Sequence, residues 1–385
     1  MIQSLRLTNI RCFENKKFEF APGINLIIGP NGSGKTSILE GIAFFAFGRF
    51  LSVDYDFFIV SKGQDVGRLE LEVKKESHMK AEAVFLKDRK IIKLDDKKIP
   101  NSQIIGFIKA VLFNVDSVDL VSSSPQTRRR EIDLMITSVK PAFVRTLLQF
   151  RRVLRQRNIL LRDIALGRAQ REELNFWNRE FVNCAKAVFT ERMKFIDFVN
   201  QGISQTYDFL TKKLNSQPES PSHQTGLKLK YSSSAHYDRL EENLIGVLEE
   251  DLRIGLTTIG PHRDDIIFIN DGFPLRQGGS RGEQRLAAVA YKAEAKKFLA
   301  GEDSPVLILD DVFSELDEEK REAVAEALGL EDNENKEEPA RQLQALAGRP
   351  TRQLQALAGR QVFVSGTDER VIPPNLIKKA NIIRL

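Results

Sequence analysis

Residues Gly29 to Thr36 read Gly-Pro-Asn-Gly-Ser-Gly-Lys-Thr, and this stretch decides the fold. An apolar, β-rich run of strand length, Ile24 to Ile28, precedes it, and Ser37 to Ala43 follows with apolar residues at helical spacing. A strand, a glycine-rich loop and a helix in that order predict a phosphate-binding P-loop, because the glycines let backbone N–H groups turn inward around phosphate oxygens. The start of the helix adds its positive dipole end.

The loop also assigns chemistry to individual residues. Lys35 can reach the β- and γ-phosphates of ATP, and the Thr36 hydroxyl can bind Mg²⁺. We therefore predict ATP and Mg²⁺ as ligands. The predicted nucleotide-binding residues are Gly29, Pro30, Asn31, Gly32, Ser33, Gly34, Lys35, Thr36 and Ser37.

A pair of acids is expected beside this loop. Pro305 to Leu309 is a continuous apolar run, typical of a strand in a parallel sheet, and it ends in Asp310 and Asp311. A P-loop needs an acid at the end of a neighbouring strand to hold Mg²⁺, and we assign this role to Asp310 with Thr36. Asp311 can then orient or deprotonate the attacking water. Lys35, Asp310 and Asp311 are the predicted catalytic residues, and a strand that ends in solvated acids is the alternative.

Ser280-Arg281-Gly282-Glu283-Gln284, at the start of a predicted helix, resembles the signature motif of ATP-binding-cassette (ABC) ATPases. In that superfamily the motif receives a γ-phosphate across a dimer interface. The resemblance therefore implies an ATP-dependent homodimer in which Ser280, Gly282, Glu283 and Gln284 act in trans. The match is weak alone, because Ser, Gly and Glu also cap helices. Together with the P-loop, the paired acids and the D-loop residues Ser314 and Asp317, it is specific.

The composition is that of a soluble globular protein. The chain has 385 residues, of which 42% are hydrophobic and 29% charged, and it is long enough for two lobes. Its two cysteines do not suggest a disulfide framework. No apolar stretch matches a signal peptide or a membrane span. We expect a cytoplasmic protein that does not contact a membrane.

Charge is distributed unevenly along the chain. From Arg128 to Arg171 there are twelve Lys or Arg against three acids, whereas Glu315 to Glu338 holds eleven acids against three bases. A basic lobe suggests a polyanionic partner such as nucleic acid, although charge runs are often solvated helix faces. The candidate DNA contacts are Arg128, Arg129, Arg130, Arg151, Arg152 and Arg155. The first three could equally pair with acids between the lobes.

Hydrophobic periodicity divides the chain into two parts. Strands are predicted at 2–7 and 17–20, and then as a β-meander at 68–73, 81–86 and 91–94. From about 116 to 214 the apolar residues follow a helical period. Further strands are predicted at 266–269, 362–365 and 382–383, with a helix that ends near Leu299. A helical segment thus interrupts a nucleotide-binding domain.

Within the ABC superfamily the chain resembles the RecF family of bacterial recombination mediators over nearly its whole length. The resemblance rests on the P-loop with Leu39-Glu40, and on Leu7 to Phe13, Val111 to Phe113, Arg128 to Arg130, Arg155 to Asn158, Gly260 to Asp265 and Leu309 to Asp317. It implies an α/β fold: an ABC-type P-loop ATPase head, with a mixed sheet and an antiparallel β subdomain, at 1–115 and 256–385. An all-helical second lobe, 116–255, is inserted into it.

The same resemblance implies a function. A weak ATPase would act as a conformational switch, in which ATP drives dimerisation, the dimer clamps gapped DNA and single-stranded/double-stranded junctions, and hydrolysis resets it. The resemblance also implies cooperation with RecO and RecR proteins in loading the RecA recombinase.

The sequence departs from the superfamily pattern in several places. Asp311 stands where most cassette ATPases carry Glu, and Ser365-Gly366-Thr367 where they carry a switch histidine. Asn114 lies where a Q-loop glutamine is expected. Residues 341–349 recur unchanged at 352–360, so we predict a flexible insertion with a tandem repeat at 331–360. We assign that segment no chemistry.

Three rival functions are less consistent with the sequence. A structural SMC-type head lacks its coiled-coil arms here, and a transporter ATPase subunit would not carry the fused arginine-rich lobe. An ATP-regulated nuclease would need a second acidic cluster. His262, in the Gly260 to Asp265 stretch, is more typical of a structural residue than of a catalytic one. The other histidines, His78, His223 and His236, have no metal-ligand spacing with the cysteines.

Overall fold

The computed structural model describes residues 1–53, 55–114, 119–214, 226–300, 305–314, 318–330 and 361–385. Contacts divide the chain into two compact units, one of residues 1–118, 206–218 and 289–385 and one of residues 119–205 and 219–288. The first segment of the first unit ends at residue 118, and the predicted boundary is at 115. The second unit extends to residue 288 rather than 255, because the strand at 265–270 pairs with one at 227–232. The predicted insertion at 331–360, with its tandem repeat, lies outside the described residues.

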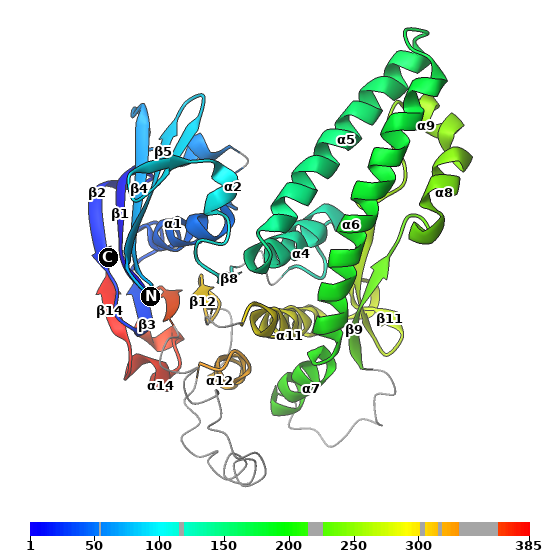
Figure 1. Cartoon of the computed structure of the whole chain (residues 1–385). Helices are drawn as coiled ribbons and strands as arrows, with labels where there is room; N and C mark the ends of the chain where they lie inside the picture. The colour runs from blue at the N-terminus through cyan, green and yellow to red at the C-terminus, as the bar shows by residue number, and fades with distance from the viewer. Residues whose placement is uncertain (54, 115–118, 215–225, 301–304, 315–317, 331–360) are drawn as a thin grey trace, which may run out of the picture. The chain divides into compact units, whose positions relative to one another are not determined.

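A five-stranded parallel sheet carries the P-loop in the first unit (Figure 1). Its strands, in the order β14-β3-β13-β12-β8, are β14 (Asn381–Arg384), β3 (Gly23–Ile28), β13 (Gln361–Gly366), β12 (Val306–Leu309) and β8 (Ala110–Phe113). The two strands that neighbour β12 run almost fully buried, because helices cover parallel sheets on both faces. The predicted strands at 24–28, 305–309, 362–365 and 382–383 all belong to this sheet.

A six-stranded antiparallel sheet forms the other layer of this unit, in the order β2-β1-β4-β5-β6-β7. The strands are β1 (Ile2–Ile10), β2 (Phe13–Glu19), β4 (Val66–Lys74), β5 (His78–Leu86), β6 (Lys90–Leu94) and β7 (Lys97–Ile99). β4 alternates buried and exposed residues, which is the pattern of a sheet with one solvated face. The predicted antiparallel β subdomain is confirmed. Its β6–β7 turn uses Asp95 and Asp96, both with positive φ.

Helix α1 (Lys35–Phe47) packs between the two sheets, since it contacts β1 and β4 of one and β13 and β8 of the other. Twelve of its 13 residues are buried, which explains why its apolar residues surround the helix instead of following one stripe. The remaining elements of the unit are η1 (Asp56–Ile59), α2 (Asn101–Ile104), α12 (Glu318–Ala327), η4 (Glu369–Val371) and α14 (Pro374–Ile377).

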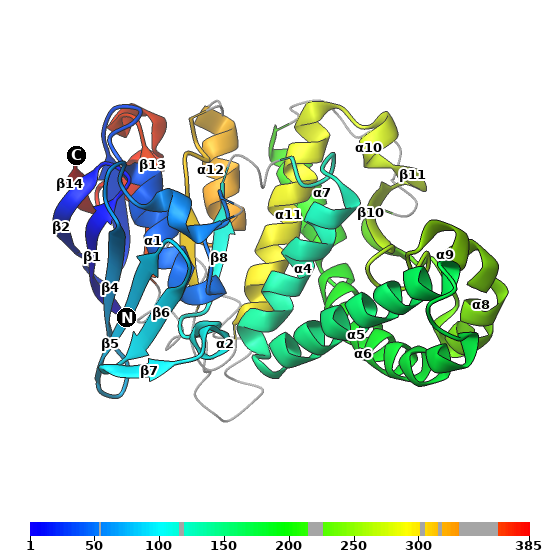
Figure 2. The same ribbon diagram turned by 90° about the horizontal axis from the view of Figure 1, so that it is seen from above.

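The second unit is built on two long antiparallel helices, α5 (Ala142–Ala165) and α6 (Leu174–Asn200), which lie side by side in both views (Figures 1 and 2). Shorter helical elements surround them: α4 (Pro125–Val139), η2 (Arg171–Glu173), η3 (Tyr237–Arg239), α8 (Leu240–Gly246), α9 (Leu248–Ile254) and α10 (Leu275–Gly278). Two helices have residues in both units, α7 (Ile203–Leu214) and α11 (Arg281–Leu299).

The second unit is not all-helical, contrary to the sequence prediction. A three-stranded antiparallel sheet, in the order β11-β10-β9, joins β9 (Leu227–Ser232), β10 (Asp265–Asn270) and β11 (Phe273–Pro274). The signal for β9 is the alternation of buried Leu227 and Leu229 with exposed Lys228 and Lys230. It is too short to stand out beside the long helical pattern. None of the described helices is long and apolar enough to cross a membrane.

Candidate nucleotide-binding site

The P-loop connects the end of β3 to the first turn of α1. Lys35 opens the helix with only 7% of its surface exposed, and its Nζ donates to the carbonyl oxygens of Gly29 and Pro30 at 2.7 and 2.9 Å. Thr36, the next residue, is exposed at the helix start. The loop itself therefore holds the lysine ammonium, and we expect the ammonium to exchange these carbonyls for phosphate oxygens when a nucleotide binds.

Gly34 is the position in the loop where only glycine fits. Its φ is 101°, and a Cβ atom there would lie 2.4 Å from the ring of Phe13 and 2.7 Å from Sγ of Cys12. Both the backbone conformation and the close approach exclude a side chain. Cys12 lies in the turn between β1 and β2 and Phe13 is the first residue of β2, so this hairpin supports the P-loop at the point where α1 begins.

The predicted metal-binding acid lies beside the P-loop threonine. Oδ1 of Asp310 accepts a hydrogen bond from Oγ of Ser365 at 2.7 Å and from Oγ1 of Thr36 at 3.3 Å. The backbone N–H of Asp310 donates to the carbonyl of Phe113 at 2.7 Å. This arrangement follows from topology, because β12 lies between β13 and β8 in parallel register and the ends of parallel strands meet at one edge.

Asp311 leaves the strand in the left-handed conformation, with φ of 57°. Aspartate tolerates this conformation better than most residues. Its backbone N–H donates to Oγ of Ser365 at 2.9 Å, and its Oδ1 accepts a hydrogen bond from the Ser314 hydroxyl. The predicted D-loop serine is therefore in contact with the predicted water-activating acid. Asp317 lies outside the described residues.

Ser365 is a site residue that the sequence analysis did not assign. It is the last residue but one of β13, and its hydroxyl contacts both Asp310 and Asp311. From the sequence, Ser365 is only the residue that stands where a switch histidine is expected. Its signal was its place at the end of a strand next to β12, which becomes informative once the strand order is known.

Burial sets the electrostatics of this site. The pKa of Asp310 is raised above its ordinary value, first by burial and further by the charge of Asp311, against the hydrogen bonds from Ser365 and Thr36. A bound cation would relieve this cost. The hydroxyl of Thr36 and the carboxylate of Asp310 are hard oxygen donors that suit Mg²⁺, which binds through few protein ligands and substrate phosphates. The residues present fit the predicted ion.

The signature residues lie at the start of α11, in the second unit. Ser280 and Glu283 form a reciprocal capping box: Oγ of Ser280 accepts from the N–H of Glu283 at 3.2 Å, and Oε2 of Glu283 accepts from the N–H of Ser280 at 2.7 Å. Gln284 donates to the carbonyls of Leu275 and Gly279. Ser280 and Gly282 are exposed, so the helix start is open to a ligand.

Comparison with known proteins places the chain in a family. The model of the RecF/RecN/SMC N-terminal domain matches residues 1–337. A protein named DNA replication and repair protein RecF from Lysinibacillus sphaericus is 30% identical over 82% of this chain and 87% of its own length. Another of that name, from Thermomicrobium roseum, is 31% identical over 83% and 88%. The chain belongs to the RecF family.

Solved structures agree with this at the level of the fold. A RecF protein bound to ATP, described as a recombination mediator of the RecFOR pathway, has a TM-score of 0.77 at 24% identity and covers 95% of this chain and 92% of its own. An Smc head bound to part of ScpA has a TM-score of 0.52 at 16% identity, over 100% of this chain and 93% of its own. The predicted ABC-type ATPase head is thus confirmed as the fold of this RecF-family chain.

The candidate DNA contacts separate into two groups in this RecF-family chain. The prediction is wrong for Arg128, whose side chain is 4% exposed and forms a two-pronged ion pair with Asp265 at 2.9 and 2.8 Å. Arg129 donates to the carbonyl of Asp264, and Arg130 is partly buried. Arg128 thus pairs with an acid, as the alternative expected, but within the second unit and not between the lobes. It does so because Arg128, in the first turn of α4, faces Asp265 at the start of β10.

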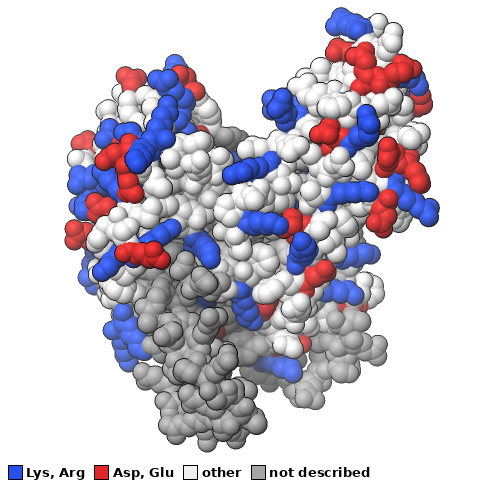
Figure 3. Space-filling model, viewed as in Figure 1, with Lys and Arg blue, Asp and Glu red and all other residues white. Residues whose placement is uncertain are grey.

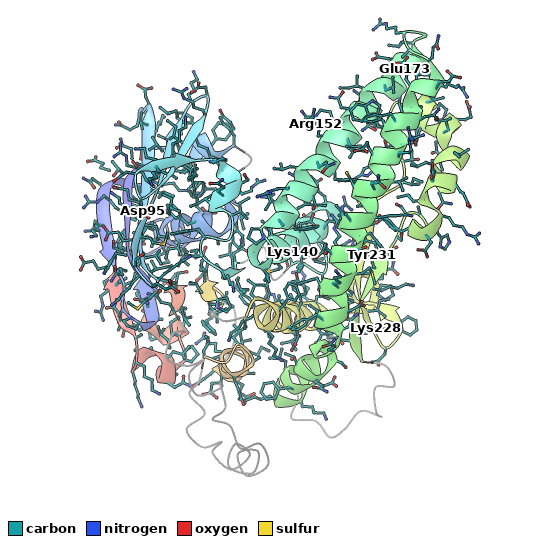
Figure 4. All side chains as sticks on the ribbon, viewed as in Figure 1. Asp95, Lys140, Arg152, Glu173, Lys228 and Tyr231 are labelled. Atoms are coloured by element: carbon teal, nitrogen blue, oxygen red, sulfur yellow. The ribbon has the colours of Figure 1, made fainter. Side chains whose placement is uncertain are left out.

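The α5 arginines are the exposed group: Arg151, Arg152 and Arg155. Arg145, about two helical turns before Arg152, is exposed as well and was not predicted. Figure 3 shows Lys and Arg predominating over α5 on the visible face, and Figure 4 shows Arg152 on the side of α5 turned away from α6. We call Arg145, Arg151, Arg152 and Arg155 the α5 arginine stripe.

The Gly260 to Asp265 stretch, a marker of the family resemblance, is a structural core of the second unit. Asp264 is 1% exposed and accepts hydrogen bonds from the hydroxyls of Tyr231, Tyr237 and Ser234 and from the N–H of Ser234. Nε2 of His262 donates a hydrogen bond to the carbonyl oxygen of Thr257 at 3.0 Å, and burial lowers the pKa of the imidazole to about 4. A neutral, buried histidine here fits the predicted structural role.

Proposed function

We propose that this chain is an ATP-dependent DNA-binding protein of recombinational repair. ATP binding drives a homodimer that clamps DNA at gaps, and slow hydrolysis returns it to monomers. One observation carries the proposal: Asp310 contacts both Thr36 and Ser365, and Asp311 contacts Ser365, beside the P-loop. These contacts would provide both a cation site and a base for water. The names of the RecF relatives support the role in repair.

Each group has a defined part in the proposed cycle. The P-loop amides and Lys35 bind the phosphates, Thr36 and Asp310 hold Mg²⁺, and Asp311 takes a proton from the attacking water. Mg²⁺, when bound, would offset the negative charge of the phosphates. The side chain of Asp311 is one methylene shorter than that of the glutamate in most cassette ATPases, so it reaches less far toward the attacking water. We therefore expect slow turnover.

The exposed signature start of α11 supports the dimer. An open helix N-terminus with a small residue at Gly282 is suited to bind the γ-phosphate held by a second copy. Cooperation with RecO and RecR in loading the RecA recombinase is the further part of the proposal, supported by the likeness to a RecF protein of the RecFOR pathway. The short α5–α6 hairpin, of 24 and 27 residues, favours this function over a structural SMC-type head.

Replacing Ser280 by Arg is expected to preserve ATP binding and abolish the ATP-dependent dimer, because a bulky cation would occupy the place of the partner's γ-phosphate. Sedimentation velocity and DNA binding, measured together with and without ATP on gapped, single-stranded and duplex DNA, test this and the proposed function. Ser124→Arg is the matched control, because Ser124 also caps a helix of the second unit and accepts from Thr127. Wild-type protein that stays monomeric with ATP and DNA would contradict the proposed function.

The α5 arginine stripe should carry phosphate contacts. We expect the triple Ala variant of Arg151, Arg152 and Arg155 to weaken binding to all DNA sequences alike, and to reduce the slope of log K against log salt by up to about 3, roughly 0.9 per contact. ATP affinity should not change. The control is a triple Ala variant of three exposed arginines elsewhere in the second unit, Arg179, Arg239 and Arg253. Equal salt slopes in the two variants would exclude the stripe as the DNA contact.

A further inference from the structure

The helix that carries the signature residues is fastened into the first unit by three buried charged side chains. Lys292, Glu294 and Lys296 of α11 are 1%, 3% and 9% exposed. Each reaches a different element: Lys292 the end of β8, Glu294 the first turns of α7 through Thr206 at 2.6 Å, and Lys296 the carbonyl of Leu328 after α12. All of these contacts lie within the first unit.

Lys292 is the member of this set that contacts the strand next to the metal-binding acid. Its Nζ donates to the carbonyl of Leu112 at 2.7 Å and lies 5.6 Å from the ring centre of Phe113. Leu112 and Phe113 are the last two residues of β8. The carbonyl of Phe113, one peptide unit further, accepts from the backbone N–H of Asp310 at 2.7 Å. The ammonium and the metal-binding acid are thus held by adjacent carbonyls of one strand.

The ammonium of Lys292 is a costly way to fill this space. A buried cation loses several kcal/mol of hydration, about as much as its partners return, whereas an apolar side chain of similar volume packs without that cost. A Met side chain would therefore fill this space as well, if packing were the only requirement. What the charge adds is direction, because a charge-assisted hydrogen bond fixes the distance between α11 and the carbonyl of Leu112 in a way that dispersion contacts do not.

We propose that Lys292 is a positioning residue for ATP hydrolysis, which sets the end of β8, and through it Asp310, relative to the helix that begins with the signature residues. A shift of α11 along its axis pulls on the carbonyl of Leu112 and is passed through Phe113 to the backbone of Asp310. Contact of Ser280 and Gly282 with a partner's nucleotide is thereby coupled to the geometry of the metal-binding carboxylate. This inference rests on the proposed function.

The test is Lys292→Met, which keeps the length and packing of the side chain and removes the charge. We expect the melting temperature and the affinity for ATP measured without Mg²⁺ to stay unchanged. Turnover should fall, and the Mg²⁺ concentration for half-maximal hydrolysis should rise, each by about 10- to 100-fold, the usual effect of losing a residue that orients a metal ligand. Lys297→Met is the matched control: Lys297 lies on the same helix, is 59% exposed and pairs with Glu294 at 2.6 Å.

Unchanged turnover and Mg²⁺ dependence in Lys292→Met would overturn the inference, as would an equal loss in Lys297→Met. A lowered melting temperature with a normal Mg²⁺ dependence would assign Lys292 to stability alone and overturn it too. If Lys292→Met does not fold, Lys292→Gln, which keeps a donor without the charge, is measured against the same expectations. Wild-type protein that neither hydrolyses ATP nor dimerises would refute the proposed function instead, so the two failures are distinguishable.

Discussion

Lys35→Ala is expected to lose ATP binding almost completely. The substitution removes the one ammonium held inside the P-loop, and the triphosphate charge then has no matching cation in the loop. Truncating one member of a buried charge pair costs about 2–5 kcal/mol, which corresponds to a loss of affinity from roughly 30-fold to a few thousand-fold. Isothermal titration with ATP and with ADP measures it, and the loss should be larger for ATP, whose γ-phosphate the lysine also reaches.

The fold should survive this change. The bonds from Lys35 to Gly29 and Pro30 are made to loop carbonyls, which water can reach once the side chain is absent, and the core of α1 is untouched. Lys17→Ala, at a surface lysine of the same unit that pairs with Glu72, should bind ATP as the wild type does. ATP affinity in Lys35→Ala equal to that of the control would show that the loop is not the phosphate site.

The sequence predicted the parts of the site that depend on short-range patterns. The P-loop needs only a strand, closely spaced glycines and a helix, and the pair Asp310-Asp311 needs only an apolar strand that ends in acids. Parallel strands bring such ends to one edge, so the contact of Thr36 with Asp310 across 274 positions was predictable from local signals. The antiparallel β subdomain followed from alternation in the same way.

What the sequence could not supply was partner choice at long range. Ser365 became a site residue because β13 lies beside β12, and strand order is not written in either strand. Arg128 has the same neighbours in sequence as a DNA-binding arginine would have, but it meets Asp265 across 137 positions and is buried. The β9 strand was hidden for a related reason, since its pairing partner β10 lies beyond two helices.

Asp311→Asn is expected to bind ATP normally and to accumulate the ATP-bound dimer. Asparagine is nearly the same size, and it tolerates the left-handed φ of this position as aspartate does, so the turn after β12 should keep its shape. Its side-chain oxygen can still accept the hydrogen bond from Ser314. What is lost is the ability to take a proton from water, which contributes about 10²- to 10⁴-fold to a hydrolysis rate.

Single-turnover hydrolysis and sedimentation velocity in ATP and Mg²⁺ measure the two effects together. Hydrolysis should slow by about that factor while the dimer fraction rises, because the step that resets the dimer has been removed. Asp96→Asn is the matched control: it makes the same change at an exposed aspartate that also has positive φ, in the β6–β7 turn of the same unit, and should behave as the wild type. A variant that hydrolyses at the wild-type rate would remove Asp311 from the mechanism. A variant that is slow but stays monomeric would leave Asp311 as the base and separate ATP hydrolysis from dimer release, since a trapped nucleotide must hold two copies together if each γ-phosphate is bound by the signature residues of the other.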